Sequence, residues 1–308
     1  MLRRALHFLM LLPLIAGGAA QLCSCVKDDR EACLFPLNLQ FSYTYNRERR
    51  NLLAEEVAGV RLYLFDACCG ELCDTISMRM SDLSGGNDTL IWNVTPGQYR
   101  VVAWGGNVDA SRYQLSSDGT FGGSRLSVPS GNGRTVVQSK DHLWYGAAAD
   151  IVVDGAADAP VRHIDMRKYS NDVHVVVEGL PAGAFPDLSC TISAGNGEYD
   201  FDGVESSDSL VVWLPESRME GGNAVCDFTV LRLRPGDDSQ LHVALSGSNS
   251  VIYDGSLSGL LLQNPSLDLD LDDDFLVRLV YRSGPGGGFD VSIYVNGWHV
   301  IDMVGPLE

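Results

Sequence analysis

Basic residues are scarce in this sequence, which has 22 Lys and Arg against 40 Asp and Glu and a formal net charge of -18. Nucleic-acid binding requires clustered positive charge, so we expect no nucleic-acid partner. The acidic residues are spread over many segments, which favours solubility over a single binding field.

Long apolar runs are almost absent as well. The run from Leu9 to Ala20 is shorter than the roughly 20 residues that span a bilayer, and Arg3 and Arg4 precede it. A positively charged start followed by a short apolar run is typical of a signal peptide. No second run reaches membrane-spanning length, so we predict that residues 1–24 are a signal peptide.

Catalytic motifs are missing too. The sequence has no His-Glu-x-x-His, no Gly-x-Ser-x-Gly and no glycine loop that opens a helix and could hold phosphate. Cys68, Cys69 and Cys73 crowd one expected hairpin, but no fourth Cys or His lies near them to complete a zinc site. We therefore expect no enzyme activity, no cofactor and no metal site.

An acidic run near the C-terminus suggests calcium at first sight. Its members are Asp268, Asp270, Asp272, Asp273 and Asp274. An EF-hand loop counted from Asp268 would place Asp273 where glycine is needed and Leu279 where glutamate is needed. Leucines alternate with the first three aspartates, so we predict a strand with an acidic solvent face. A calcium site of another kind, built with other loops, remains the alternative.

The apolar run ends at Leu22-Cys23-Ser24-Cys25, which resembles a bacterial lipobox. Leu22 lies three residues before Cys25 and the small Ser24 lies one before it, whereas Cys23 follows a leucine that is too large. We predict diacylglycerol and an amide-linked chain on Cys25, which together make membrane attachment stable. An ordinary secretory signal is the alternative.

A charged string follows the predicted lipid site. Lys27, Asp28 and Asp29 resemble the export signal of Bacteroidetes surface lipoproteins. The same residues could also serve only as a soluble tether. The first interpretation predicts display on the outer face of the outer membrane.

Strand patterns dominate the remaining 284 residues. Five apolar residues alternate with polar ones and indicate a half-buried strand: Leu37, Leu39, Phe41, Tyr43 and Tyr45. One short helix is expected over 49–58. Further strands are expected at 60–65, 89–94, 98–104, 151–153, 172–178, 189–193, 225–234, 240–246, 275–281 and 290–295.

Many short strands, 33 glycines and little helical periodicity predict an all-β protein of two tandem antiparallel β-sandwich domains. The segment 154–162 is rich in Gly and Ala and is expected to be the linker. The domains would then be residues 25–160 and 161–308.

Six cysteines remain after processing: Cys33, Cys68, Cys69, Cys73, Cys190 and Cys226. In an exported protein they can pair, and the two in the second half lie on separate expected strands. The sequence leaves the pairing open.

The chain resembles the FimB-like fimbrial anchor family, lipoprotein subunits of the type V pili of Bacteroidales, over nearly all of its mature length. The segments that carry the resemblance are Phe41–Asn46, Val60–Asp66, Pro96–Gly106, Leu143–Gly146 and Val295–Trp298. The resemblance implies two transthyretin-like sandwiches, held at the outer membrane by lipid and joined to the shaft or accessory subunits of a fimbrium.

Subunit contact is expected to use strand complementation in the N-terminal domain, where a partner strand adds backbone hydrogen bonds and fills pockets. The apolar residues Leu37 to Tyr45 are the candidates for this groove or partner strand. Arg47, Arg49 and Arg50 form a site for an arginine-specific protease, and cleavage there would release everything downstream from the membrane. An anchor must therefore keep this segment intact.

Two other functions compete with the anchor role. A surface glycan-binding lipoprotein would need exposed aromatic side chains along a groove, but most of the five tryptophans lie in strand patterns that favour core packing. A shaft or tip subunit of the same fimbria would have a similar sequence.

Overall fold

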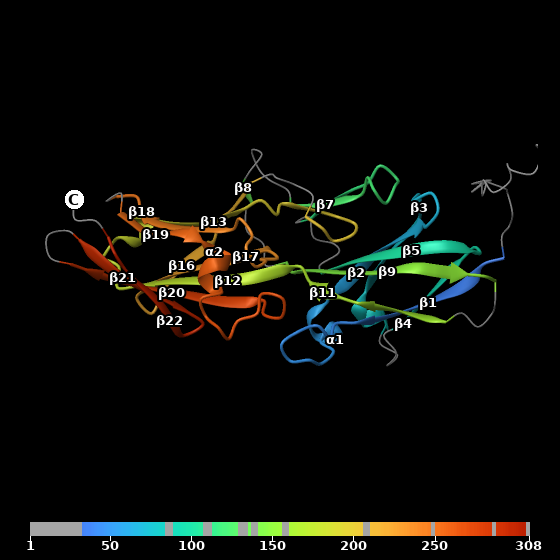
Figure 1. Cartoon of the computed structure of the whole chain (residues 1–308), viewed down its shortest axis with the longest axis horizontal. Helices are drawn as coiled ribbons and strands as arrows, with labels where there is room; N and C mark the ends of the chain where they lie inside the picture. The colour runs from blue at the N-terminus through green and yellow to red at the C-terminus, as the bar shows by residue number, and fades with distance from the viewer. Residues whose placement is uncertain are drawn as a thin grey trace, which may run out of the picture. The chain divides into compact units, whose positions relative to one another are not determined.

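The computed structural model describes residues 33–83, 89–106, 113–128, 135–136, 141–155, 160–205, 210–247, 250–284 and 288–305. Leu34–Glu308 forms one compact unit, which the description below concerns. Strands make up 59% of the structure and helices 7%, which confirms the predicted all-β class (Figure 1). No helix among them is long and apolar enough to cross a membrane.

The N-terminal sandwich consists of a three-stranded and a five-stranded sheet. The first has the order β10-β1-β4 and the second the order β11-β9-β5-β2-β3. Their bounds are β1 (Phe35–Ser42), β2 (Gly59–Asp66), β3 (Leu72–Arg79), β4 (Thr89–Val94), β5 (Gly97–Gly106), β9 (Leu143–Val153), β10 (Val161–Asp165) and β11 (Arg167–Lys168). Between the sheets, Leu39 of β1, Leu62 of β2 and Val101 of β5 are fully buried in one core. The predicted alternation is confirmed from Leu37 to Phe41, but the strand ends at Ser42, before Tyr43 and Tyr45.

The outer face of the five-stranded sheet is also covered. A small sheet of order β14-β7-β6, formed by β6 (Gln114–Ser116), β7 (Arg125–Ser127) and β14 (Glu198–Asp200), forms a third layer. Tyr63, Phe65 and Trp104 point to this side, and their rings contact Phe201. Because both faces of β2 are buried, its sequence is almost uniformly apolar and does not alternate.

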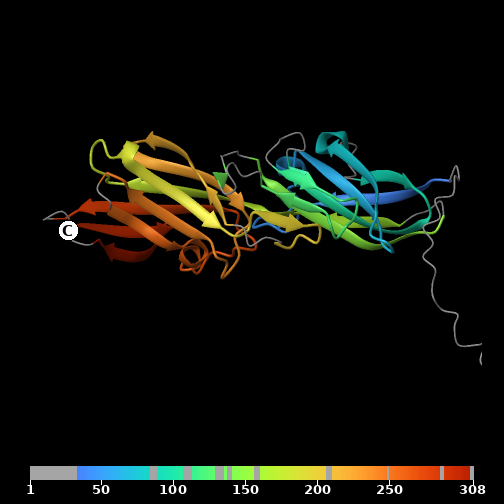
Figure 2. The ribbon, with the colours of Figure 1, turned by 90° about the horizontal axis from the view of Figure 1, so that it is seen from above.

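The second half forms its own sandwich. Its six-stranded sheet has the order β16-β17-β12-β20-β21-β22 and its five-stranded sheet the order β19-β18-β13-β15-β8. The bounds are β8 (Thr135–Val136), β12 (Ser170–Glu178), β13 (Leu188–Ala194), β15 (Val211–Trp213), β16 (Glu216–Glu220), β17 (Asn223–Leu231), β18 (Gln240–Leu245), β19 (Ser250–Ser256), β20 (Asp274–Ser283), β21 (Phe289–Val295) and β22 (Trp298–Val304). The last three strands, coloured red, lie side by side in Figures 1 and 2.

Helices are few and short: α1 (Leu53–Glu56), α2 (Leu257–Leu261) and the 3-10 turns η1 (Met80–Leu83) and η2 (Phe185–Asp187). The helix expected over residues 49–58 is thus reduced to four residues. The N-cap residue of α1, Leu52, has no side chain that can accept a hydrogen bond, and the Asn51 side-chain oxygen accepts from the Leu53 N–H instead.

The chain does not pass from one sandwich to the other at the expected linker. β10 and β11 follow residue 160, yet β10 pairs with β1 and β11 pairs with β9, so the chain leaves the N-terminal sandwich only at Tyr169. β8 precedes residue 160, yet it pairs with β15 of the second half. The Gly- and Ala-rich segment after β9 connects β9 to β10 within one sandwich, and composition alone does not separate such a loop from a linker.

Residues 268–273 of the acidic run form turns and only Asp274 belongs to a strand, β20, so the predicted acidic strand was wrong. The backbone N–H of Asp272 donates to the carbonyl of Asp268, and the Asp268 carboxylate accepts from the N–H of Asp270. The Asp272 carboxylate in turn accepts from the N–H of Asp268. Aspartates that bond to nearby backbone favour turns over sheet ladders, and this overrides the Leu-Asp alternation.

Candidate functional site: strand β1 and the acidic loop that meets it

The predicted site residues fall into two groups. The lipid site Cys25 and the export string Lys27, Asp28 and Asp29 lie outside the described residues. The groove candidates lie on β1 and directly after it: Leu37, Leu39, Phe41 and Tyr43 are at most 2% exposed, and Tyr45 is half-buried. The guanidinium of Arg167 lies 4.3 Å from the centre of the Tyr45 ring.

β1 occupies the middle of its sheet. Asn38 to Ser42 pair in parallel with Val161 to Asp165 of β10, and Phe35 to Gln40 pair antiparallel with Thr89 to Val94 of β4. The side chains of Leu37, Leu39 and Phe41 therefore form the core and do not line an open groove in this structure. β1 itself fills the position between its two neighbours.

The segment after β1 is held in a compact loop. The side-chain amide of Asn46 donates to the carbonyls of Tyr43, at 2.9 Å, and Arg50, at 2.8 Å. The side-chain oxygen of Asn51 accepts from the backbone N–H of Tyr43 at 2.9 Å and of Leu53 at 3.1 Å. These four bonds fix the loop that carries the three arginines.

The arginines of this loop differ in their contacts. Arg47 donates from Nε and Nη2 to the two carboxylate oxygens of Asp272, each at 2.7 Å, and from Nη2 to the carbonyl of Ser266 at 2.6 Å. Arg50 pairs with Glu48 and Glu55. Arg49 adopts the left-handed backbone region, with φ of 53°. Two of the three side chains that a protease would have to bind are therefore engaged in ion pairs.

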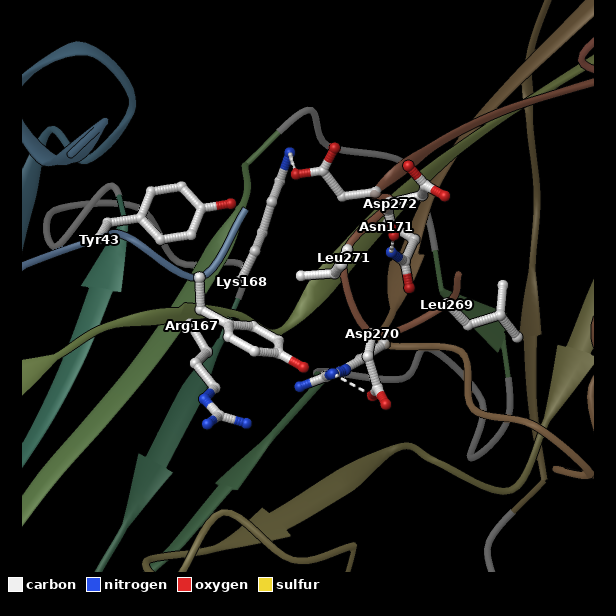
Figure 3. A pocket seen from close by; sticks show the side chains of 11 residues that line it. Tyr43, Arg167, Lys168, Asn171, Leu269, Asp270, Leu271 and Asp272 are labelled. Atoms are coloured by element: carbon white, nitrogen blue, oxygen red, sulfur yellow. Dashed lines mark hydrogen bonds and ion pairs between the residues drawn. The ribbon is translucent and has the colours of Figure 1, made fainter. Parts of the chain in front are cut away.

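The acidic loop of residues 266–274 meets the end of β1 at a row of ion pairs. Besides the Arg47–Asp272 pair, Nζ of Lys168 lies 3.0 Å from Oδ2 of Asp273, and Nη2 of Arg232 lies 2.6 Å from Oδ1 of Asp270. Figure 3 shows Tyr43 and Lys168 on one side of this region and Asp270, Leu271 and Asp272 on the other. The carboxylates that suggested calcium thus lie beside basic side chains of the protein itself.

Burial first, and neighbouring charges second, shift the pKa values of two groups in this region. Burial raises the pKa of Tyr43, and the charges of Asp273 and Glu56 raise it further. Loss of solvent around Glu56 raises its pKa, which the nearby Lys168 opposes. A recess of about 140 Å³ lies next to these groups, lined by both loops. Among the described residues, no cluster of three or more His, Cys, Asp or Glu is arranged to hold a metal ion.

Aromatic side chains do not form a glycan platform among the described residues. Trp92, Trp104, Trp144 and Trp213 are at most 3% exposed, and only Trp298, on the edge strand β22, is largely exposed. A single exposed tryptophan does not make the aromatic groove that the glycan-binding interpretation needs.

Four of the described cysteines are exposed and two are buried. Cys33, Cys68, Cys69 and Cys73 are exposed, whereas Cys190 on β13 and Cys226 on β17 are buried in the same core. The hydrogen bond between the Cys190 and Cys226 thiols, followed by burial, raises the pKa of Cys190. These two thiols are therefore in contact across the facing sheets.

Sequence reasoning missed the partners of the β1 segment. Asp272 is 225 residues from Arg47 in the chain, and Asp165 is 123 residues from Ser42. No local pattern joins residues so far apart. The only available signal was that several arginines follow β1 while several aspartates cluster near the C-terminus.

Solved structures show the same fold. The anchor protein Mfa2 from Porphyromonas gingivalis matches with a TM-score of 0.72 and 24% identity, covering 88% of this chain and 100% of that one. A candidate adhesin from Bacteroides ovatus matches with a TM-score of 0.72 and 17% identity, covering 86% and 94% of the two chains. A candidate polysaccharide-binding protein from Bacteroides thetaiotaomicron matches with a TM-score of 0.70 and 20% identity, covering 86% and 97%.

A comparison with curated proteins finds no match. The family model of the fimbrillin-A associated anchor proteins Mfa1 and Mfa2, in contrast, matches residues 30–304, nearly the whole chain. Together with the β-sandwich fold, this match confirms the fimbrial resemblance seen in the sequence: the chain belongs to the family of fimbrillin-A associated anchor proteins.

Proposed function

We propose that this protein is a lipid-anchored subunit of the outer membrane that joins a fimbrial shaft to the cell surface. The observation that carries the proposal is the position of the lipobox, because Cys25 lies five residues before the region that matches the anchor family. Acyl chains on Cys25 would fix the N-terminal end, and the folded unit would bind the shaft. The protein catalyses no reaction in this proposal.

Contact with the shaft would use a strand added beside β4. β4 has β1 as its hydrogen-bonded neighbour and no second one among the described strands, whereas β10, on the other side of β1, lies beside β9. Ile91 of β4 is 62% exposed on the outer face. A partner strand at this edge would gain backbone hydrogen bonds, and alternate side chains would contact the apolar surface.

Disulfide crosslinking tests this contact. Cysteines would be placed one at a time along β4, at Leu90, Ile91, Trp92 and Asn93, and along the terminal strand of the neighbouring pilin, with the native exposed cysteines replaced by serine. We expect crosslinks from the outward-facing Ile91 and Asn93 and none from the buried Trp92, because side chains alternate between the two faces of a strand.

The matched control is β3, the edge strand of the other sheet, with cysteines at Ser77 and Met78. Crosslinks at β3 instead of β4 would place the partner on the five-stranded sheet. If neither edge crosslinks in assembled fimbriae while both proteins are folded, the subunits dock by their surfaces and the strand contact is wrong.

The charged string is expected to direct display on the cell exterior. Replacing Lys27, Asp28 and Asp29 together by Ala removes the charges that resemble the export signal. We expect the variant to stay membrane-bound but to become inaccessible to protease added to intact cells. Unchanged accessibility, with equal expression, would mean that the string is only a tether.

A further inference from the structure

β1 and β10 form a parallel pair that the chain enters and leaves at opposite ends. The chain reaches β1 at Leu34, next to the end where Asn38 pairs with Val161. β10 ends at Asp165, opposite Ser42, and the chain continues through Tyr169 into β12 of the second half. A pull between Leu34 and the second half therefore acts on the start of one strand and on the end of its parallel partner.

This geometry loads the hydrogen bonds in shear. When two parallel strands are drawn apart from opposite ends, all their hydrogen bonds resist together, whereas a pull at the same end opens them one after another. The five residue pairs with β10 and the six with β4 flank β1 on both sides, so both ladders resist its removal. The buried side chains of Leu37, Leu39 and Phe41 would also have to leave the core.

Asp165 adds a pin at the far end of β1. Its carboxylate accepts from the Ser42 hydroxyl at 2.9 Å, the Thr44 backbone N–H at 3.3 Å and the Thr44 hydroxyl at 3.2 Å. The backbone N–H of Met166 donates to the carbonyl of Ser42 at 2.7 Å. These bonds fasten the end of β1 to the end of β10. They resist together with the ladders when the strands are loaded in shear, and they are reached last when β1 is unzipped from Leu34.

The Arg47–Asp272 pair is a second contact that resists the pull once the β1 ladders have broken. The two-pronged contact of Arg47 with one carboxylate, together with its bond to the Ser266 carbonyl, fastens the loop after β1 to the second half of the chain. A chain that has lost β1 would still be held at Arg47.

We propose that β1 and the loop after it form a shear clamp, which resists force applied through the N-terminus first by the β10-β1-β4 ladders and then by the Arg47–Asp272 pair. The proposal deepens the proposed function and rests on it in one respect, namely that the natural pull comes through lipid on Cys25. The mechanical property itself is a property of residues 34–272 and does not require the lipid.

Force spectroscopy on the purified, non-lipidated protein tests the clamp by comparing two geometries on the same strands. One handle is attached before Leu34. The second is placed either in the exposed Gly221–Gly222 turn or at exposed Pro160. The turn lies at the far end of β12, because Val177 pairs with Ala224 and Ser170 with Leu231. It therefore gives shear, whereas Pro160, at the start of β10, gives unzipping.

We expect the force of the first rupture to be several-fold higher in the shear geometry. The length gained identifies the released segment, at about 3.5 Å per extended residue. In the shear geometry the first gain should end at Arg47, and a second rupture should follow. Equal forces in the two geometries, or a first rupture whose length excludes β1, would overturn the proposal.

Two substitutions, one at the exposed Asp165 and one at the partly buried Asp272, separate the parts of the clamp. Asp165→Asn should lower the first rupture force in the shear geometry, where the pin is loaded together with the ladders. It should leave the unzipping force unchanged, because unzipping from Leu34 reaches the pin last. Asp272→Asn should abolish the separate second rupture. Asp150→Asn, on an exposed position of β9 outside these contacts, is the matched control and should change neither.

A clamp that fails these tests while native Cys25 still carries lipid would leave the anchor function intact and remove only the mechanical proposal. A clamp that passes while Cys25 is unmodified would keep the mechanical property and remove the membrane as the source of the force. The two results are therefore distinguishable.

Discussion

Replacing Cys25 by Ala is expected to release the protein completely from the membrane fraction. Two or more acyl chains make attachment stable where one is marginal, and the described residues offer no membrane-spanning helix as a substitute. The measurement is membrane fractionation with mass spectrometry of the mature N-terminus, which should begin at a lipid-modified Cys25. Assembled fimbriae should then appear in the culture medium instead of on cells.

Cys33→Ala is the matched control, because this cysteine lies close by and is exposed. It should leave attachment unchanged. An unmodified Cys25 in the native protein, or a mature chain that starts at another residue, would contradict both the lipobox interpretation and the lipid anchor.

Phe41→Ala is expected to destabilise the protein by about 3–5 kcal/mol, since truncating a fully buried phenylalanine removes apolar contacts and leaves a cavity. Phe41 is 1% exposed and lies in β1 between two hydrogen-bonded neighbours. A loss of this size is a large share of the roughly 5–15 kcal/mol that stabilises a typical protein. Chemical denaturation, followed by tryptophan fluorescence, measures the change in free energy of unfolding.

Gln40→Ala provides the control on the same strand. Its side chain points to the outer face, so the change should stay within about 0.5 kcal/mol. If the two variants lose equal stability, β1 is not part of the core. If Phe41→Ala is folded and still stable but no longer joins fimbriae, the side chain contacts the partner and the groove interpretation of β1 regains support.

The sequence predicted the fold class because the longest strands carry the clearest patterns. β1 shows a strict alternation of apolar and polar residues, and β12, β20 and β21 lie where strands were expected. Strands of two or three residues, such as β8 and β15, are too short for any period to be detected. Their positions are determined by pairing with distant segments.

The contacts of β1 and of the acidic loop were harder to predict from the sequence than the fold class. Leu37, Leu39 and Phe41 were correctly predicted on the apolar face of a strand, but alternation does not tell a core strand from a groove lining. The acidic run was misread because its aspartates bond to their own backbone and to Arg47, Lys168 and Arg232, which come from other parts of the chain. Such contacts depend on the tertiary structure.

The pairing of β8 with β15 constrains how this protein can exchange parts with its relatives. Recombination that joins the first 160 residues of one chain to the remainder of another would place β8 and β15 from different parents in one sheet, and would separate β10 and β11 from the sandwich that they complete. Each half therefore carries strands that the other needs. We therefore expect the two sandwiches to be exchanged only together, and sequence variation to enter through substitutions and loops and not through the shuffling of whole domains.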